Sequence, residues 1–167
     1  MQADQEASAA EAQVHPFTTR AEFNDYVQQC LARATHTLQL FDPDFALWNL
    51  GGTAADAALR RFLGGQGRLR LVAHSNAELE RHAPRFLRLL KDFSHLIECR
   101  LTPQGLRQLS DSFCVADGVH IVRRYHADHM RGVAAFQTRF DTKLSIDRFD
   151  AIWLESNPGL HASTTGL

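Results

Sequence analysis

The sequence predicts one α/β domain with a mixed β-sheet and helices on both of its faces. Helix-like and strand-like segments alternate from about residue 19 to residue 101, an order that requires parallel strands joined by right-handed crossovers. Three short β segments and a final helix follow, which adds antiparallel strands to the same sheet. The chain has 167 residues, of which 44% are hydrophobic and 22% charged, as is typical of a single globular domain.

The first helix and the first strand have clear boundaries. Thr19 and Glu22 form a capping box, in which each side chain reaches the other residue's backbone, and apolar residues then recur at helical spacing to about residue 34. Residues 36–42 are typical of a strand, and Pro43 ends it because proline supplies no N–H to a ladder.

Two further helix–strand pairs follow. A second helix begins at Thr53 after two glycines and is stopped by the glycine-rich segment 64–67, before a strand at 68–74. A third helix covers 84–93, with Pro84 at its first position, and precedes a strand at 96–101. Whether this helix reaches back to Ser75 stays open, because Pro84 would then lie inside it.

The remaining segments predict a β-meander and a closing helix. The stretches 112–118, 119–125 and 132–137 are typical of strands, and the first two meet at Asp117-Gly118, a strong hairpin signal. At such a turn we expect Asp117 to have a structural role and the substitution Asp117→Asn to be close to neutral. The last helix, at about 142–156, has Phe149 and Trp153 on its core face.

Composition narrows the functional classes. With a net charge of −1 and a pI of about 6.7, the chain lacks the basic surplus that drives nucleic-acid binding, so nucleic acid is not favoured as a partner. The three cysteines form no CxxC pair, which favours a cytoplasmic location. No apolar run is long enough for membrane insertion, and the acidic first residues do not resemble a signal peptide. We expect a flexible leader at 1–16, the domain at 17–157 and a flexible tail at 158–167.

The run from Leu109 to Ser156 resembles the C-terminal part of a phospholipase D-like half-domain. In that family a strand carries His-x-Lys with an Asp five residues after the Lys, a Gly-Ser-x-Asn turn follows, and a helix of the form Phe-x-x-x-Trp closes the module. Here Asp117 stands in the acidic position, Gly132 begins the next turn, and Phe149 and Trp153 are four residues apart. The upstream order of elements agrees, so the resemblance covers roughly residues 19–156 and implies the same fold.

The residues that carry the family's chemistry differ in this chain. With Asp117 aligned, Ser110 replaces the His and Ser112 replaces the Lys, and Val-Ala-Ala follows Gly132 without the usual hydroxyl and amide. In the family the histidine attacks phosphorus and lysines stabilise the charged oxygens. The resemblance therefore implies a half-domain without catalysis, with a vestigial pocket of Ser110, Ser112, Asp117 and Gly132. The chain is also similar to small bacterial proteins that carry such degenerate modules, some attached to acyltransferase domains.

A second group of polar residues has the donor types of a metal site. His126, Asp128 and His129 suit Zn²⁺, and three such ligands with an open position are typical of catalytic zinc. The segment is expected to be a loop, where this spacing has little meaning, so we expect no bound metal and no cofactor.

A third group lies at the ends of predicted strands. Asp42 and Asp44 bracket Pro43, and Arg123 and Arg124 end a later strand, so the four form a candidate rim for a ligand. Two aspartates around a proline are equally typical of a turn.

These observations predict a non-catalytic binding or interaction module. Its partner would be another protein or a small anionic ligand, and a homodimer is compatible with the sequence. A phosphodiesterase or metal-dependent hydrolase with a rebuilt site is the alternative, and a purely structural homo-oligomer is a third reading.

Overall fold

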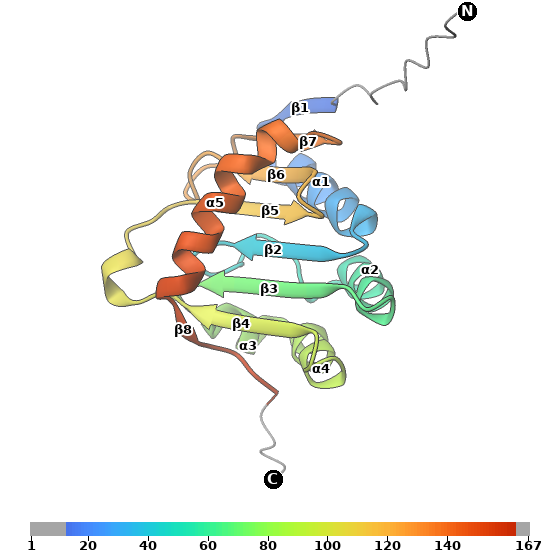
Figure 1. Cartoon of the computed structure of the whole chain (residues 1–167), viewed down its shortest axis with the longest axis vertical. Helices are drawn as coiled ribbons and strands as arrows, with labels where there is room; N and C mark the ends of the chain where they lie inside the picture. Colours follow the sequence, from blue (N-terminus) through green and yellow to red (C-terminus); the bar gives the residue numbers. More distant parts are fainter. Residues whose placement is uncertain (1–12, 163–167) are drawn as a thin grey trace, which may run out of the picture.

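An eight-stranded mixed sheet forms the centre of the computed structural model, which describes residues 13–162 (Figure 1). The strands are β1 (Gln13–Phe17), β2 (Thr37–Phe41), β3 (Arg68–Ala73), β4 (Ile97–Leu101), β5 (Ser112–Ala116), β6 (His120–Arg124), β7 (Gly132–Phe136) and β8 (Asn157–Pro158). The helices are α1 (Arg20–Arg33), α2 (Thr53–Gly64), α3 (Ala77–His82), α4 (Pro84–Asp92) and α5 (Arg139–Glu155), with a 3₁₀ turn, η1, at Gln104–Leu106.

The sheet order is β1-β7-β6-β5-β2-β3-β4-β8. Strands β2, β3 and β4 are parallel, and every other neighbouring pair is antiparallel. The parallel half and the added meander confirm the predicted mixed sheet with helices on both faces. In the described part of the chain, no helix is long and apolar enough to cross a membrane.

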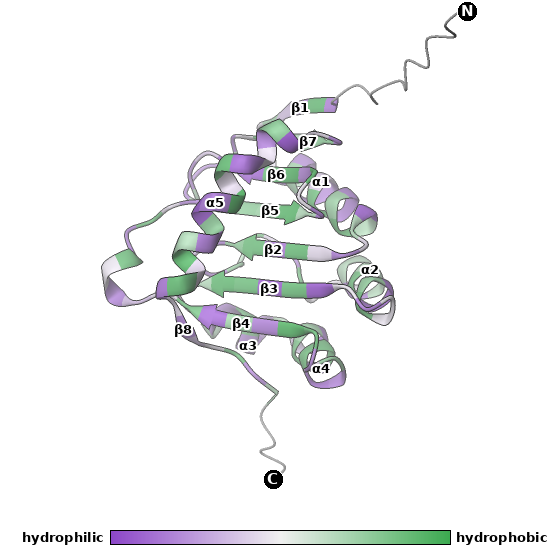
Figure 2. Ribbon diagram, in the orientation of Figure 1, coloured by the Kyte–Doolittle hydropathy of each residue, from purple (hydrophilic) through white to green (hydrophobic). Residues whose placement is uncertain are grey.

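Two hydrophobic clusters lie on opposite faces of the sheet. Helices α1 to α4 cover one face and α5 crosses the other (Figure 1). Because side chains alternate along a strand, Leu38 and Leu40 of β2 join the larger cluster under α1 while Phe41 joins the smaller one under α5. The central strands carry mostly hydrophobic residues, as expected for a sheet covered on both sides (Figure 2).

The capping signals act largely as predicted. Thr19 Oγ1 accepts from the Glu22 backbone N–H (3.2 Å) and starts α1, while the Glu22 carboxylate accepts from the Thr19 hydroxyl (2.8 Å). The chain before Pro84 is helical, but as a separate helix, α3, which ends at His82. Helix α5 begins at Arg139, earlier than expected, because Thr138 Oγ1 accepts from the Asp141 N–H and caps the helix there.

The Asp117-Gly118 hairpin is present between β5 and β6. Asp117 and Gly118 have φ angles of 55° and 69°, as a type I′ turn requires, and the Val119 N–H donates to the Ala116 carbonyl at 3.0 Å.

The ordered domain extends beyond both expected boundaries. Residues 13–16, expected in the leader, belong to β1, which pairs antiparallel with β7. Pro16 is tolerated there because β1 is an edge strand. After residue 157, β8 pairs with β4, and Leu160 packs against the larger cluster. The rest of the predicted leader and tail, residues 1–12 and 163–167, lies outside the described residues.

Candidate functional site

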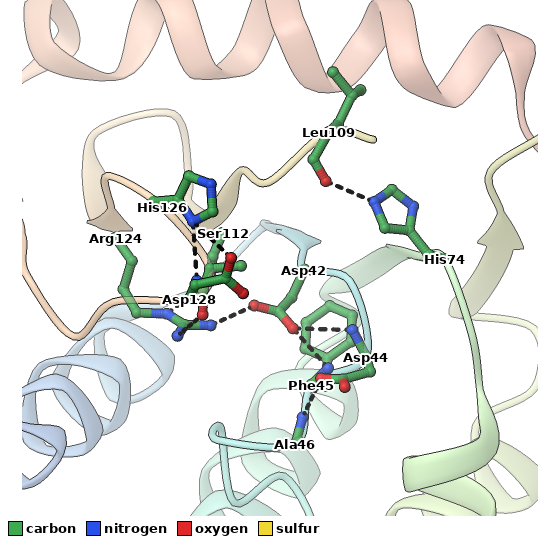
Figure 3. A network of polar contacts seen from close by, with 11 residues as sticks. Asp42, Asp44, Phe45, Ala46, His74, Leu109, Ser112, Arg124, His126 and Asp128 are labelled. Atoms are coloured by element: carbon green, nitrogen blue, oxygen red, sulfur yellow. Dashed lines mark hydrogen bonds and ion pairs between the residues drawn. The ribbon is translucent and has the colours of Figure 1, made fainter. Parts of the chain in front are cut away.

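The carboxyl ends of the parallel strands bring several polar residues to one edge of the sheet (Figure 3). Asp42 follows β2 and His74 follows β3. Strand β5 runs antiparallel to β2, so its first residue, Ser112, lies at this edge. Strand β6 runs antiparallel to β5, so its last residue, Arg124, lies there as well. This is the edge at which open α/β sheets bind ligands.

A buried ion pair between Asp42 and Arg124 is the centre of this edge. Arg124 Nη2 lies 2.7 Å from Asp42 Oδ1, and each side chain is only 2% exposed. Arg124 Nε donates to Ser112 Oγ (3.2 Å), and Nη1 donates to the Ala127 carbonyl (2.8 Å). All three guanidinium nitrogens therefore have internal acceptors, and the carboxylate neutralises the charge.

The Asp42 carboxylate is fixed by the turn that follows it. Its Oδ2 accepts from the backbone N–H groups of Asp44 (3.0 Å) and Phe45 (2.7 Å), and Phe45 has a positive φ of 62°. Asp44 in turn accepts from the Ala46 N–H at 2.9 Å. The two aspartates thus make the turn that was one reading of the sequence, and Asp42 holds Arg124 as well.

Gly132 lies beside this pair as a packing residue. The sequence predicted that Gly132 begins a turn, but in the structure it lies in β7, opposite Arg124 of β6. A Cβ atom at Gly132 would lie 2.1 Å from the Arg123 carbonyl oxygen and 2.6 Å from the Phe17 ring. Only glycine permits this close approach of the backbones, so Gly132 does not open a pocket.

His74 is a histidine of this edge that sequence reasoning missed. Its Nε2 lies 2.7 Å from the Leu109 carbonyl and its Nδ1 lies 2.6 Å from Thr102 Oγ1. A carbonyl can only accept, so Nε2 donates to Leu109, and Nδ1 is held by its hydrogen bond with the Thr102 hydroxyl. Neither nitrogen is free to act as a base or nucleophile. The neighbouring Ser110 accepts through its carbonyl from the Ala127 N–H at 2.7 Å.

Asp117 does not belong to this edge. It lies at the opposite end of β5 from Ser112, about 16 Å away along an extended strand. Ser110, Ser112, Asp117 and Gly132 therefore do not form the single pocket that was predicted. The prediction failed because Ser112 begins β5 and Asp117 follows its last residue, so the two lie at opposite ends of the strand.

The Asp117 carboxylate ties the hairpin to the start of β2. Oδ1 accepts from the backbone N–H groups of His36 (2.7 Å) and Thr37 (2.9 Å), and Oδ2 accepts from the N–H (2.9 Å) and hydroxyl (3.0 Å) of Thr35. Burial alone would raise the pKa of Asp117, but the hydrogen bonds from Thr37, His36 and Thr35 outweigh it and lower that pKa. This structural role agrees with the sequence interpretation. The four hydrogen bonds to the carboxylate, however, predict that Asp117→Asn destabilises the fold, where the sequence predicted a nearly neutral substitution.

The four residues of the predicted rim, Asp42, Asp44, Arg123 and Arg124, do not face one common site. Arg124 is buried, whereas Arg123 is exposed and lines a groove on the α5 face. Consecutive residues of a strand point to opposite faces, which separates the two arginines.

His126, Asp128 and His129 lie in the loop between β6 and β7. His126 Nδ1 is 3.4 Å from the Asp128 carboxylate and also 3.1 Å from the Asp128 backbone N, and the His126 and His129 rings are 5.6 Å apart. Among residues 13–162, no group of three or more His, Cys, Asp or Glu side chains is placed to hold a metal ion.

Comparisons with known proteins agree on the fold. Nuc from Salmonella typhimurium, a phospholipase D family member, has a TM-score of 0.65 at 11% identity, covering 89% of this chain and 99% of that one. NucT from Helicobacter pylori has a TM-score of 0.60 at 8% identity, covering 89% and 100%. TrmBL2, an archaeal chromatin protein, has a TM-score of 0.65 at 12% identity, covering 94% and 57%.

Sequence comparison gives a family without an assigned activity. No curated protein matches the chain. Residues 19–161 match the model of a family described as a domain of unknown function, DUF7931. Since this match spans most of the sequence, the chain belongs to the DUF7931 family, and its fold is phospholipase D-like.

Proposed function

We propose that the chain is a non-catalytic module of the phospholipase D-like fold that functions by binding a partner. The observation that carries the proposal is the buried cluster of Asp42, Arg124 and Ser112. Ser112 stands where the family has its lysine, and the cation next to it, Arg124, is neutralised by Asp42 rather than free to bind phosphate.

The energetics of this cluster oppose a phosphate site. Freeing Arg124 for a phosphate would leave Asp42 as an unpaired buried charge, which costs about 3–5 kcal/mol. That cost corresponds to roughly two to four orders of magnitude in affinity. A phosphodiester would therefore bind poorly at this edge.

The nucleophile is missing as well. Ser110 and Ser112 lack an imidazole, and both ring nitrogens of nearby His74 are engaged by Thr102 and the Leu109 carbonyl. A serine nucleophile needs an adjacent base to remove its proton. His74 does bond to the segment that contains Ser110, but its partner there is the Leu109 carbonyl and not a serine hydroxyl.

A binding role has a precedent in the same fold. TrmBL2 is an archaeal chromatin protein with a DNA-binding mode of its own, and its fold resembles that of this chain. A net charge of −1 argues against DNA as the partner here, since phosphate neutralisation drives such binding. We therefore favour a protein partner, bound through the exposed apolar side chains of α5.

The catalytic half of the proposal is tested by hydrolysis of bis(p-nitrophenyl) phosphate, with EDTA and with added Mg²⁺ or Zn²⁺. We expect no turnover by the wild type, nor by the Ser110→His, Ser112→Lys double variant, because Arg124 and Asp42 still occupy the site. Wild-type turnover that Ser112→Ala abolishes, and that the exposed Ser94→Ala control retains, would establish a rebuilt active site and overturn the proposal.

A further inference from the structure

Two of the three cysteines meet inside the larger hydrophobic cluster. Cys30 lies on the inner face of α1, and Cys114 lies in the middle of β5, 84 residues further along the chain. Both are free thiols, both side chains are fully buried, and their sulfur atoms are 3.5 Å apart. The fold therefore brings two thiols into van der Waals contact although they are far apart in the sequence.

Hydrogen bonds turn the two sulfur atoms toward each other. The Cys114 thiol donates to Cys30 Sγ, and the Cys30 thiol donates to the Cys114 carbonyl oxygen at 3.9 Å. Because the S–S bond of a disulfide is about 2.05 Å long, the sulfurs would need to approach by about 1.5 Å. Small rotations of the two side chains and a slight shift of α1 on the sheet would supply this change.

The third cysteine is too far away to compete. Cys99 lies on β4, and the strand register aligns it with Leu71 of β3, Leu40 of β2 and Cys114 of β5. Neighbouring strands are about 4.8 Å apart, so three such steps separate Cys99 from Cys114 by about 14 Å. A disulfide needs Cα atoms within about 7 Å of each other. Cys30, and not Cys99, is therefore the partner that the fold gives to Cys114.

We propose that Cys30 and Cys114 form an oxidation site, at which a small peroxide converts the two thiols into a disulfide that links α1 to β5. This inference concerns the response of the fold to oxidation and is independent of the proposed function. Helix α1 packs on β5 and β6 as one layer, and its outer side, which includes Asp25 and Gln29, is exposed (Figure 1). An oxidant hardly larger than water needs only a small opening of this layer to reach the sulfurs.

The oxidation takes place in two steps. First, one sulfur attacks the peroxide: an S–O bond forms, the O–O bond breaks, and the thiol proton leaves with the second oxygen as water. The other sulfur then attacks the sulfenic acid: the S–S bond forms, the S–O bond breaks, and the hydroxyl group leaves with the remaining thiol proton as water. Two thiols are thereby oxidised to one disulfide, and one peroxide is reduced to two waters.

The surroundings of the pair make this reaction slow but its product durable. The hydrogen bond with Cys30 and burial raise the pKa of Cys114 well above its usual value. Since the thiolate is the reactive form, the folded protein should keep both thiols under mild conditions and react over hours with excess peroxide. The same burial should protect the finished disulfide from reductants until the domain opens.

The link should stabilise the fold. It would close a loop between residues 84 positions apart and so restrict the unfolded chain. A loop of this length predicts that the equilibrium constant for unfolding falls on the order of a hundredfold. The oxidised protein should therefore unfold at a higher urea concentration than the reduced protein, and dithiothreitol added in urea should reverse the gain.

Peptide mapping of the folded, full chain after treatment with millimolar hydrogen peroxide at neutral pH tests the proposal. Trypsin cuts after lysine and arginine, which leaves the three cysteines on separate peptides, 21–33, 92–100 and 108–123. Remaining thiols are alkylated in denaturant before digestion. We expect peptides 21–33 and 108–123 as one linked species, lighter than their sum by two hydrogen atoms, and an alkylated Cys99.

Variants provide the controls. Cys99→Ala should give the same link, whereas Cys30→Ala should give none and should lose the gain in urea. Three results would overturn the inference: alkylated or over-oxidised Cys30 and Cys114 without a link, a link that includes Cys99, or a linked protein that unfolds more easily than the reduced one. Turnover in the phosphodiester assay would instead overturn the non-catalytic function and leave the oxidation site standing.

Discussion

Replacing Asp117 with asparagine removes the charge that holds the β5–β6 hairpin against the start of β2. The carboxylate accepts three backbone N–H groups and one hydroxyl. Asparagine offers one oxygen, so its amide nitrogen would face the Thr35 N–H, and the bonds from His36 and Thr37 would go to a neutral acceptor.

The magnitude follows from these bonds. A hydrogen bond to a charged group is worth about 1.5–3 kcal/mol and a neutral one about 0.5–1.5, so two weakened bonds and one lost bond cost several kcal/mol in a dry site. Asp117 is partly exposed, and water can replace part of the loss. We expect Asp117→Asn to lower the free energy of unfolding by about 1–3 kcal/mol.

The pH dependence gives the effect a signature. The pKa of Asp117 is lowered by folding, so its contribution is present above the unfolded value of about 4 and is lost as the pH falls through the folded value. In urea denaturation the gap between wild type and variant should therefore be full at pH 7 and shrink below about pH 4. Asp150→Asn, an exposed site 3.8 Å from Arg70, is the control and should have little effect. No gap at pH 7, or a gap that is constant from neutral to acid pH, would refute the reasoning.

Three further predictions concern buried groups. Asp42→Asn should lower the free energy of unfolding by about 3–5 kcal/mol, because it leaves Arg124 without its counter-charge. In urea denaturation the double variant Asp42→Asn, Arg124→Gln should recover part of that loss. Losses that simply add in the double variant would contradict a coupled pair. Gly132→Ala should destabilise the domain or prevent it from folding, because the added Cβ would meet the Arg123 carbonyl oxygen. The control is Gly105→Ala, whose Cβ meets nothing within 4 Å, and thermal melts should show no such loss for it. Burial raises the pKa of Cys99 to about 12, so a thiol reagent at pH 8 should label it only at the rate of unfolding, and rapid labelling of the native protein would contradict its burial.

Local signals predicted most of the fold. The capping residue Thr19, the glycine-rich stop at 64–67 and the Asp117-Gly118 turn each act within a few residues, and the corresponding elements form where expected. Helix α2 also begins at Thr53, but its N-cap is Gly52 and no side chain caps it. Strands β1 and β8 were missed because both are short edge strands, and their pairing with β7 and β4 is a long-range contact. Pro16 within β1 also hides its strand pattern.

The candidate site was predictable only in part. The resemblance, aligned on Asp117, places Ser110 and Ser112 at the family's His and Lys positions, but it did not predict the buried pair of Arg124 and Asp42 beside Ser112. Arg124 and Asp42 are 82 residues apart, and no local pattern joins them. One signal in the sequence does predict that Arg124 is buried. Side chains alternate along β6, so Arg124 lies on the same face as Val122, which packs in the core under α1, and Arg123 lies on the other face.

The side chain of Arg124 is the most direct probe of the central proposal, that its internal ion pair with Asp42 leaves no cation free to bind phosphate. Its Nε–H resonance can be followed by ¹⁵N NMR while inorganic phosphate is added at millimolar concentrations. We predict a slowly exchanging resonance that phosphate does not shift, because Nε donates to Ser112 and the guanidinium is bound to Asp42. A shift that saturates with phosphate, and that disappears in Arg124→Gln, would show that the pair opens to bind anions and would contradict the account.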